Sequence, residues 1–396
     1  PENFRINELV SYYNNDPSLE FTILTGAPNY PQGKIYAAYK DQPGDYINFN
    51  KNVEIIRIPI VPRGQSAIQL ILNYLSHIFS ASLFGLWKLR KHSYDHIFIF
   101  EPSPIFIGLP AIVLKKYFKC SMSIWVLDIW PESLVALKKI KENGVIYKLV
   151  LKITKAIYSE CNIIFASSRE FVKHIQSVTN KKEGIYFLPN WVEEQAPDPN
   201  FSSLQLLPDD QNFKYLFAGN VGEAQGFPEL IKAFKIAIDL NKNIHLYIVG
   251  DGRYLETAKT LVADLDLQSY IFFISWQLPS AIPYFLATAD ALILSLKANP
   301  IYEITIPGKL PNYMMASKPI LAVLGKEGSK IIEEAQCGFV SAPGNVQELA
   351  SNIQHMSTLS VAEKSMLGKN ARNYAKTNFS KEPLLADFKN KLSTLT

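Results

Sequence analysis

Cysteine and histidine are scarce in this chain. Three cysteines and six histidines occur among 396 residues. Cys120, Cys161 and Cys337 lie far apart, are odd in number and lack metal-ligand spacing. This argues against a disulfide framework, and we expect buried thiols in a reducing compartment. No histidine lies on a glycine-rich loop or in a motif, so we expect structural roles for His77 and His174.

Charged residues are also few, at 19%, whereas hydrophobic residues make up 48%. This composition is typical of a globular protein and leaves no room for a large disordered part. A chain of 396 residues exceeds what a single hydrophobic core usually supports. We therefore expect two domains.

The net charge of +4 is unevenly distributed. Residues 1–190 carry 22 Lys and Arg against 15 Asp and Glu, and the remainder is slightly acidic. A basic half can attract nucleic acid, an anionic membrane surface or a phosphorylated substrate. The basic clusters are not interleaved with a base-stacking motif, so nucleic acid is the weakest of the three and is not expected as a partner.

The longest uncharged run, residues 65–87, predicts a helix that is long enough to reach across a bilayer. Polar residues interrupt it, among them Gln69, Asn73 and His77. Two alternatives remain: a helix buried in the core, or one that lies in the membrane interface with its basic end at the headgroups. No cleavable signal peptide is visible. The opening PENFR reads as the loop and helix entry that follow a first strand, and we expect that strand to be missing here.

Strand and helix patterns alternate along the chain, with one break in composition. We predict an N-terminal domain over residues 1–190, a polar linker over 191–212, a C-terminal domain over 213–375, and a final helix over 376–396 that packs back on the N-terminal domain. The alternation predicts an α/β protein with two doubly wound, Rossmann-like domains that face a central cleft.

The stretch from Leu216 to Ile238 reads as a buried strand, a glycine-rich turn and an amphipathic helix that begins near Pro228. The turn contains Gly219, Gly222 and Gly226. Such a turn directs backbone N–H groups and the positive end of a helix toward one place, which suits a phosphate. A tight connection without a ligand is the alternative.

Further loops follow strands of the same domain. Gly250, Gly252 and Arg253 repeat the strand-then-glycine pattern, Ser275 and Gln277 follow another strand, and Glu303, Pro307 and Lys309 follow a third. Together they offer amides, cations and a carboxylate, as a nucleoside diphosphate attached to a polyhydroxyl group requires. Lys309, at a predicted helix start, suits a pyrophosphate oxygen, although a solvated lysine is the alternative.

Two carboxylates follow strands of the N-terminal domain, Glu101 in EPSP and Asp128 in VLDIWPES. Ligands of open α/β sheets bind outside the carboxyl ends of the strands. Both are therefore candidates to contact or activate an acceptor hydroxyl. Capping of a neighbouring helix is the alternative role.

Five motifs taken together resemble one enzyme family. They are AGNVGEAQG, IVGDGR, IPGKLPNYMMASKPIL, EPSPIFIGLPA and VLDIWPES. The chain resembles the group 1 (family 4) retaining glycosyltransferases of the GT-B fold, and within them the bacterial O-antigen and capsule N-acetyl-L-fucosamine transferase branch. The opening PENFRINELV also fits that branch.

The resemblance implies a UDP-sugar donor in the C-terminal domain and an acceptor in the N-terminal domain. It places the base near Ser275 and Gln277, the pyrophosphate near Gly219, Asn220 and Lys309, and the sugar against Glu303. It also implies acceptor contacts at Glu2, Asn3 and Arg5. Two departures stand out: Asn220 and Gln225 replace the family's usual cations, and Asn312 stands where a ribose-binding carboxylate is expected.

Asp264-Leu265-Asp266 spells the Asp-x-Asp pattern of metal-dependent transferases, but it ends a predicted helix and reads as a surface pair. We expect no metal and no cofactor. The expected protein is a metal-independent, retaining glycosyltransferase that moves an N-acetylated amino sugar, plausibly N-acetyl-L-fucosamine, from UDP to a polyprenyl-diphosphate-linked saccharide. It would act in O-antigen, capsule or exopolysaccharide biosynthesis, cytoplasmic and peripheral on the bacterial inner membrane. A sugar-nucleotide 2-epimerase and a non-catalytic nucleotide-sugar-binding protein are the alternatives.

Overall fold

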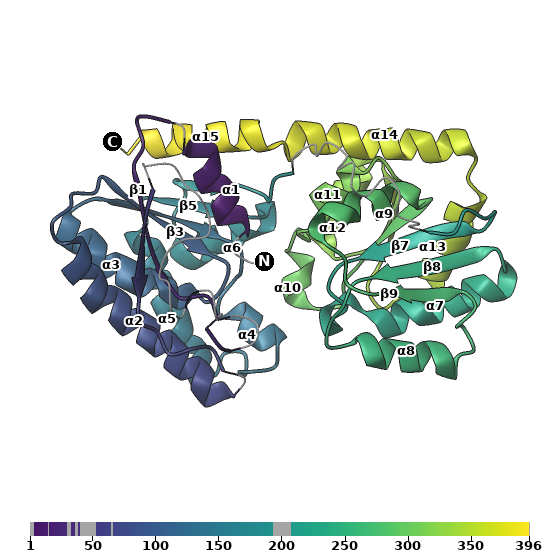
Figure 1. Cartoon of the computed structure of the whole chain (residues 1–396), viewed down its shortest axis with the longest axis horizontal. Helices are drawn as coiled ribbons and strands as arrows, with labels where there is room; N and C mark the ends of the chain where they lie inside the picture. Colours follow the sequence, from purple (N-terminus) through teal and green to yellow (C-terminus); the bar gives the residue numbers. More distant parts are fainter. Residues whose placement is uncertain are drawn as a thin grey trace. The chain divides into compact units, whose positions relative to one another are not determined.

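The computed structural model divides the chain into two compact units (Figure 1). Unit 1 comprises Pro1–Ser167, Val172–Leu188 and Leu385–Thr396, and unit 2 comprises Ser168–Phe171 and Pro189–Leu384. The structure describes residues 4–14, 16–29, 33–35, 39, 53–64, 66–192 and 207–395. Two acceptor candidates, Glu2 and Asn3, and most of the predicted linker lie outside the described residues.

Unit 1 holds a four-stranded parallel sheet in the order β3-β4-β5-β6. Its strands are β3 (His96–Glu101), β4 (Ser121–Val126), β5 (Ile163–Ala166) and β6 (Ile185–Phe187). Apolar residues such as Ile124, Trp125 and Phe165 bury the central strands on both faces, as parallel sheets require. β1 (Phe21–Gly26) and β2 (Val53–Ile58) form a separate parallel pair.

Helices cover both faces of the unit 1 sheet. On one side α2 (Ala67–Leu89) contacts α3 (Gly108–Phe118), which contacts α5 (Val145–Glu160). On the other side Phe388 of α15 (Lys381–Ser393) contacts the rings of Phe98, Phe165 and, on α1 (Phe4–Tyr13), Tyr13. Other helical segments among the described residues of this part of the chain are η2 (Ile105–Ile107), α4 (Glu132–Ala136) and α6 (Arg169–Thr179).

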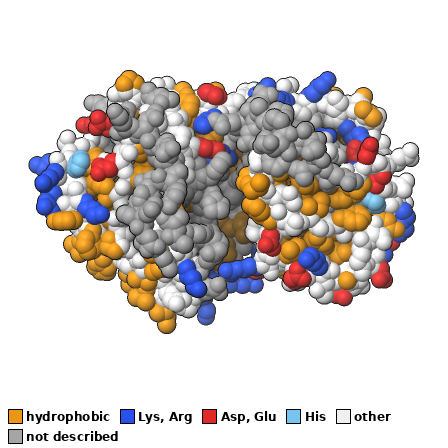
Figure 2. Space-filling view, viewed as in Figure 1, with side chains coloured by type: hydrophobic (Ala, Val, Ile, Leu, Met, Phe, Trp, Pro, Cys, Tyr) orange, Lys and Arg blue, Asp and Glu red, His pale blue; other side chains and the backbone are white. Residues whose placement is uncertain are grey.

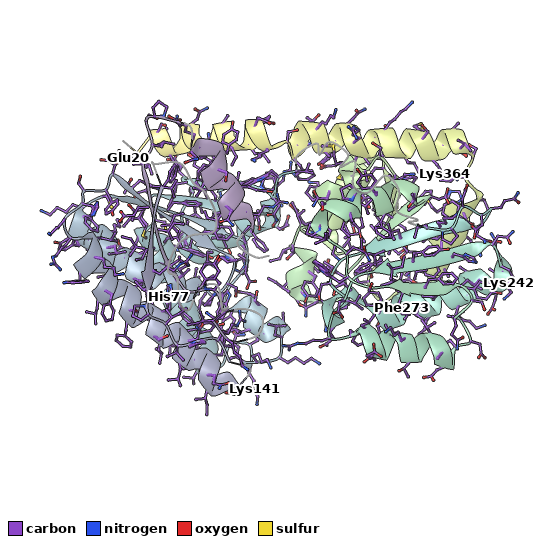
Figure 3. The ribbon with its side chains drawn as sticks, in the orientation of Figure 1. Glu20, His77, Lys141, Lys242, Phe273 and Lys364 are labelled. Atoms are coloured by element: carbon purple, nitrogen blue, oxygen red, sulfur yellow. The ribbon has the colours of Figure 1, made fainter. Side chains whose placement is uncertain are left out.

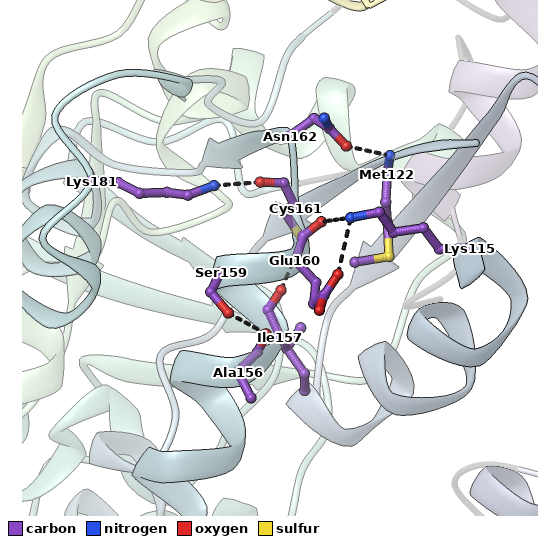
Figure 4. Close-up of polar contacts among 9 residues, drawn as sticks. All are labelled: Lys115, Met122, Ala156, Ile157, Ser159, Glu160, Cys161, Asn162 and Lys181. Atoms are coloured by element: carbon purple, nitrogen blue, oxygen red, sulfur yellow. Dashed lines mark hydrogen bonds and ion pairs between the residues drawn. The ribbon is translucent and has the colours of Figure 1, made fainter. Parts of the chain in front are cut away.

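Polar contacts tie the end of α5 to its neighbours (Figure 4). The Lys115 ammonium of α3 donates to the Glu160 carbonyl at 2.6 Å and to its carboxylate at 3.0 Å. The Cys161 thiol donates to the Ile157 carbonyl at 3.3 Å, and its own carbonyl accepts from Lys181. These bonds account for the buried, inert setting of Cys161.

Unit 2 is a six-stranded, all-parallel sheet in the order β12-β11-β10-β7-β8-β9. The chain order reverses between β7 and β10, which makes the carboxyl ends of these two strands the topological switch point. The strands are β7 (Phe213–Ala218), β8 (Ile244–Val249), β9 (Ile271–Ile274), β10 (Ala291–Ser295), β11 (Ile320–Val323) and β12 (Gly338–Ser341).

Two helical layers enclose this sheet. One contains α7 (Phe227–Leu240), which contacts α8 (Leu255–Asp264) and α13 (Val346–Thr358). The other contains α9 (Ile282–Thr288), α11 (Leu310–Met315), α12 (Lys326–Ala335) and α14 (Val361–Asn378). Two short helices, η4 (Glu223–Gln225) and α10 (Pro300–Glu303), follow β7 and β10. Unit 2 is therefore doubly wound, as the alternating pattern predicted.

Several local expectations are confirmed and one is corrected. The predicted strands all form, and the uncharged run is a helix that begins at Ala67 with a Ser66 capping box. A 3-10 turn, η2, directly precedes α3. Cys161 and Cys337 are buried as expected, but Cys120, at the turn before β4, is only half-buried.

Candidate donor and acceptor sites

The turn after β7 is shaped by glycine. Gly219 has φ of +137°, and its amide donates to the Val249 carbonyl of β8 at 2.8 Å. Gly250, with φ of +144°, meets the Gly219 carbonyl so closely that a Cβ atom could not fit. The two predicted glycine loops therefore lie against each other at the ends of adjacent strands, as the sequence predicted.

The loop after β10 joins this pair at the switch point. The Lys297 amide donates to the Ala224 carbonyl at 2.8 Å, and the Lys297 ammonium pairs with Glu223 at 2.7 Å. Within the first loop, the Gly222 amide donates to the Gln225 side chain at 3.0 Å. Gln225 therefore helps to hold the loop in shape.

Lys309 extends over the same strand end. It precedes the first residue of α11, and its ammonium lies 3.9 Å from the centre of the Phe217 ring. A Cβ atom added to Gly219 would lie 2.5 Å from Lys309 Nζ, so the glycine makes room for the lysine. Burial lowers the pKa of Lys309 to about 7. No acidic group among the described residues forms an ion pair with this ammonium.

Such a lysine is poised for an anion. A cation that has lost water without gaining a carboxylate recovers the lost stabilisation when a phosphate arrives. The site therefore has one enclosed ammonium beside the first glycine loop, at the carboxyl edge where α/β sheets bind their ligands.

Glu303 has a structural partner in this arrangement. Its carboxylate accepts from the Lys326 amide at 2.9 Å, so it caps the N-terminus of α12. Gly325 lies directly against Glu303, and the proximity fixes the end of α10. The residue as a whole is half-buried.

The other donor candidates lie on loops and on α11 of the same unit. Gln277 donates to the Ser275 carbonyl at 3.1 Å in the segment after β9. Arg253 is exposed in the turn before α8, Asn312 is exposed on α11, and Pro307 is buried before it. Asn220 lies beside Gly222 and Gly252.

Two aromatic residues of unit 2 were not predicted as site residues: Trp276 was considered only as part of the Ser275–Gln277 loop, and Tyr313 only within the IPGKLPNYMMASKPIL motif. Tyr313 is buried, and its hydroxyl accepts from the Ala218 amide at 2.7 Å and donates to the Ala218 carbonyl at 3.0 Å, so it fixes the end of β7. Trp276 is 60% exposed beside Ser275 and Gln277, where a flat ring suits stacking against a base. The sequence signal for Trp276 is its position inside the predicted base loop, between Ser275 and Gln277.

In unit 1, Glu101 ends β3 and is completely buried. Neither carboxylate oxygen has a hydrogen-bond partner among the described residues. Burial, and next the nearby Asp128, raise the pKa of Glu101 well above its usual value. The amides of Asp128 and Leu127 oppose this rise without reaching hydrogen-bond geometry. Glu101 therefore favours its protonated form and is too enclosed to meet an acceptor directly.

Asp128 follows β4 and is better placed for contact with a ligand. It accepts from the Trp130 indole at 3.0 Å and from the Ser133 hydroxyl. Burial raises its pKa, and the bonds from Ser133, Trp130 and Ser103 partly offset that rise. The residue as a whole is half-buried, whereas Glu101 is completely buried. It does not cap the backbone of α4.

The remaining candidates have polar partners or lie on the surface. Arg5, on α1, pairs with Glu8 at 2.7 Å. His174 lies 3.5 Å from the Glu132 carboxylate, in keeping with a structural role. Asp264 and Asp266 are exposed at the end of α8. Within the described residues, no cluster of three or more His, Cys, Asp or Glu could hold a metal.

Comparisons with known proteins bear on this geometry. Residues 201–374 match the family model for glycosyl transferases group 1. The chain is 25% identical over 327 residues to the "Probable glycosyltransferase WbjE" of Pseudomonas aeruginosa, covering 81% of this chain and 80% of that protein. It is 24% identical over 387 residues to the "Putative colanic acid biosynthesis glycosyl transferase WcaI" of Escherichia coli (strain K12), covering 94% and 91%.

Solved structures share the fold. Sucrose-phosphate synthase from Thermosynechococcus elongatus superimposes with a TM-score of 0.77 at 15% identity, covering 100% of this chain and 93% of that one. HepE of Anabaena in complex with UDP gives 0.69 at 16% identity, covering 95% and 100%. Residues 201–374 therefore form a glycosyl transferases group 1 domain, within a chain that has two Rossmann-like units of the GT-B fold class.

Proposed function

We propose that the chain is a retaining, metal-independent glycosyltransferase that takes its sugar from a UDP-sugar. The observation that carries this proposal is the enclosed Lys309 ammonium beside Gly219 of the first glycine loop. A departing diphosphate needs such fixed positive charge, which amides, a helix end and a lysine can supply without a metal. The UDP held by HepE, a neighbour in fold, supports the choice of nucleotide.

The acceptor is proposed to be a polyprenyl-diphosphate-linked saccharide bound by unit 1, in the biosynthesis of a bacterial surface polysaccharide. The basic N-terminal half suits an anionic acceptor. Two curated relatives carry glycosyltransferase names, and one of those names specifies colanic acid biosynthesis. The transferred sugar is proposed to be an N-acetylated amino sugar, with N-acetyl-L-fucosamine as the first to try.

The test is incubation with a panel of UDP-sugars and a lipid-diphosphate GlcNAc acceptor, with products read by mass spectrometry. One glycosidic product that needs both substrates supports the proposal. Product formed from the sugar nucleotide alone would instead identify a 2-epimerase. Transfer should fall at least about tenfold in Lys309→Ala and in Glu303→Ala. UDP binding with unchanged turnover in both variants would contradict the catalytic assignment.

We also propose that unit 1 docks on the cytoplasmic face of the bacterial inner membrane. α2 is long and apolar enough to cross a bilayer. One side of the helix packs on β1, β2 and α3. Only 17% of its most apolar 18-residue stretch is buried, so most of that stretch is exposed. Large apolar side chains recur every three or four residues along its exposed face, including Ile68 at 72%, Phe79 at 64% and Leu83 at 66% exposed. We call this row the α2 stripe; its members are Ile68, Ile71, Leu72, Leu75, Phe79, Leu83 and Trp87.

Hydrophobic atoms gather along this edge of the molecule (Figure 2), where Figure 1 draws α2. Exposed apolar residues also begin α5, namely Val145, Ile146 and Leu149. Lys88, Arg90 and Lys91 stand at the end of α2. An exposed apolar row with a basic end is the pattern of a helix that lies in the interface plane of an anionic membrane.

Sedimentation with phosphatidylglycerol vesicles tests the docking. The Phe79→Ser, Leu83→Ser double variant should bind at least about tenfold more weakly, because each large side chain contributes about 1.5–3 kcal/mol when buried. Leu240→Ser, which removes an equally exposed leucine of unit 2, is the matched control. A wild-type protein that ignores anionic vesicles would contradict the proposal.

A further inference from the structure

A small cavity of about 180 Å³ lies in unit 1, where α2 passes the carboxyl ends of β2 and β3. It is smaller than the roughly 300 Å³ of a pocket for a drug-sized ligand, so it suits a compact group rather than a whole sugar nucleotide. Three segments build it: the chain after β2, the N-terminal half of α2 and the β3–α3 connection. The polar lining comprises Arg63, Asn73, Tyr74, His77 and Ser103.

We propose that this cavity binds the diphosphate of the lipid-linked acceptor, while the hydrocarbon chain lies along the α2 stripe. The inference rests on the proposed function and assigns the acceptor end of that site. Three features of unit 1 support it: the charge of the lining, the two faces of α2, and the connection to Asp128.

The lining includes one cation, Arg63, and several side chains that can form hydrogen bonds. No aspartate or glutamate is among the described residues around the cavity, whereas Arg63 is. The Arg63 amide donates at 2.8 Å to the side chain of Asn29, which is itself buried and donates to the Ala27 carbonyl at 2.9 Å. The backbone of Arg63 is therefore fixed, and a guanidinium matches the paired oxygens of a phosphate.

His77 adds a second polar group from α2. Figure 3 labels it among the side chains between α2 and the rest of unit 1. Burial lowers the pKa of His77, which favours the neutral imidazole. A neutral ring can donate or accept a hydrogen bond and does not repel the Arg63 guanidinium. The sequence predicted a structural role for His77, and the proposal adds a role in ligand binding.

The same turns of α2 carry both the polar lining and the α2 stripe. Ile71, Leu72 and Leu75 are exposed, whereas Tyr74 and His77 face the cavity from positions between and beside them. A lipid whose hydrocarbon chain lies along the α2 stripe can therefore place its diphosphate in the cavity on the other side of the same helix. Asn73 keeps this end of α2 in place, because its amide donates to the Val61 carbonyl at 2.6 Å.

The cavity shares a wall with the surroundings of Asp128. The rings of Tyr74 and Phe106 lie 6.2 Å apart, and those of Phe106 and Trp130 lie 5.5 Å apart. The Trp130 indole donates both to Ser103, which lines the cavity, at 3.2 Å and to Asp128 at 3.0 Å. A sugar attached to a diphosphate in the cavity therefore lies next to the candidate acceptor carboxyl.

Binding of farnesyl diphosphate to the full chain tests the proposal, measured by calorimetry beside farnesol and inorganic pyrophosphate. Arg63→Ala should weaken farnesyl diphosphate at least about tenfold and leave farnesol unchanged. Lys182→Ala, which removes an exposed cation of the same unit, should change affinity less than twofold. UDP affinity should be equal in all three proteins. His77→Phe is a second test, which serves if Arg63→Ala folds poorly. It fills the cavity from another element, and it should weaken farnesyl diphosphate by a similar factor.

Equal weakening by Arg63→Ala and Lys182→Ala would overturn the assignment, as would displacement of farnesyl diphosphate by UDP, which would place the probe in the donor site. If wild type transfers the sugar and both cavity variants have an unchanged KM for the acceptor, the cavity assignment is overturned. The proposed function would still stand. Arg63-dependent binding without transfer from any UDP-sugar would support the cavity and contradict the glycosyltransferase proposal.

Discussion

At the scale of single residues, Lys309 shows how a binding site opposes stability. Its pKa of about 7 in the folded chain lies below the ordinary value of 10.5. The unfolded chain therefore binds more protons between these values, so this lysine destabilises the ligand-free protein fully below pH 7 and not at all above about pH 10.5.

Replacement of this lysine should separate stability from binding. Lys309→Met should raise the free energy of unfolding of the ligand-free protein by about 1–3 kcal/mol at pH 6–7, allowing for partial exposure, and the gain should fade toward pH 10. UDP affinity should fall at least about tenfold. Urea denaturation across pH and calorimetry with UDP measure the two effects. Lys297→Met, whose ammonium has an acidic partner, should show no such gain.

Wild-type UDP affinity should itself depend on pH through Lys309. Below pH 7 the ammonium is already charged, whereas above pH 7 binding must take up a proton, so affinity should fall by up to about tenfold per pH unit. Calorimetry in buffers of different ionisation enthalpy would detect the proton. A pH profile that is the same in wild type and Lys309→Met would refute the assignment.

The raised pKa of Glu101 leads to a prediction in which stability changes with pH in the opposite direction. Its folded-state pKa is raised, so the folded chain holds the proton more tightly, and stability is lost as pH rises above about 4.5. Glu101→Gln should match wild type near pH 4.5 and become the more stable protein by pH 8, as followed by urea denaturation. Exposed Glu20→Gln should track wild type throughout. Destabilisation by Glu101→Gln at every pH would show that the charged carboxylate is required.

At the scale of elements, the two glycine loops pack directly against each other, so a substitution in one should disturb the other. Gly250→Ala places a Cβ against the Gly219 carbonyl and strains a backbone at φ of +144°. We expect a loss of at least about 3 kcal/mol in stability and a loss of UDP binding. Gly344→Ala has the strain alone, since nothing lies within 4 Å of its added Cβ, and should cost about 1 kcal/mol with UDP affinity intact. Thermal melts with and without UDP distinguish these outcomes.

At the scale of the whole chain, the C-terminal residues complete the core of unit 1. Phe388 is buried against Phe98, Phe165 and Tyr13, and the Tyr13 hydroxyl donates to the Leu385 carbonyl. Phe388→Ala should destabilise unit 1 by about 3–5 kcal/mol. Hydrogen exchange should show lost protection in β3, β4 and β5 and not in β7 or β8. Asp387→Ala, on the exposed side of α15, is the control, and a loss confined to unit 2 would contradict the assignment.

The sequence by itself determined the elements and their class. Apolar runs bounded by glycine and proline gave the strands, helical spacing gave α1 and α7, and the motifs gave the glycosyltransferase resemblance. These features are local, because they depend on the side chains and backbone freedom of neighbouring residues. The candidates Gly219, Gly250 and Lys309 could therefore be identified from local patterns, and they do lie together in the fold.

Only the tertiary structure decided which of those residues are enclosed and by what. Spacing could not tell that α2 would expose its apolar row, that Glu303 would cap α12, or that Glu101 would be sealed without a partner among the described residues. Tyr313, His77 and Arg63 carry no sequence signal, because their roles depend on segments distant in the chain. Burial and pKa arise from what packs around a group, and no local pattern records that.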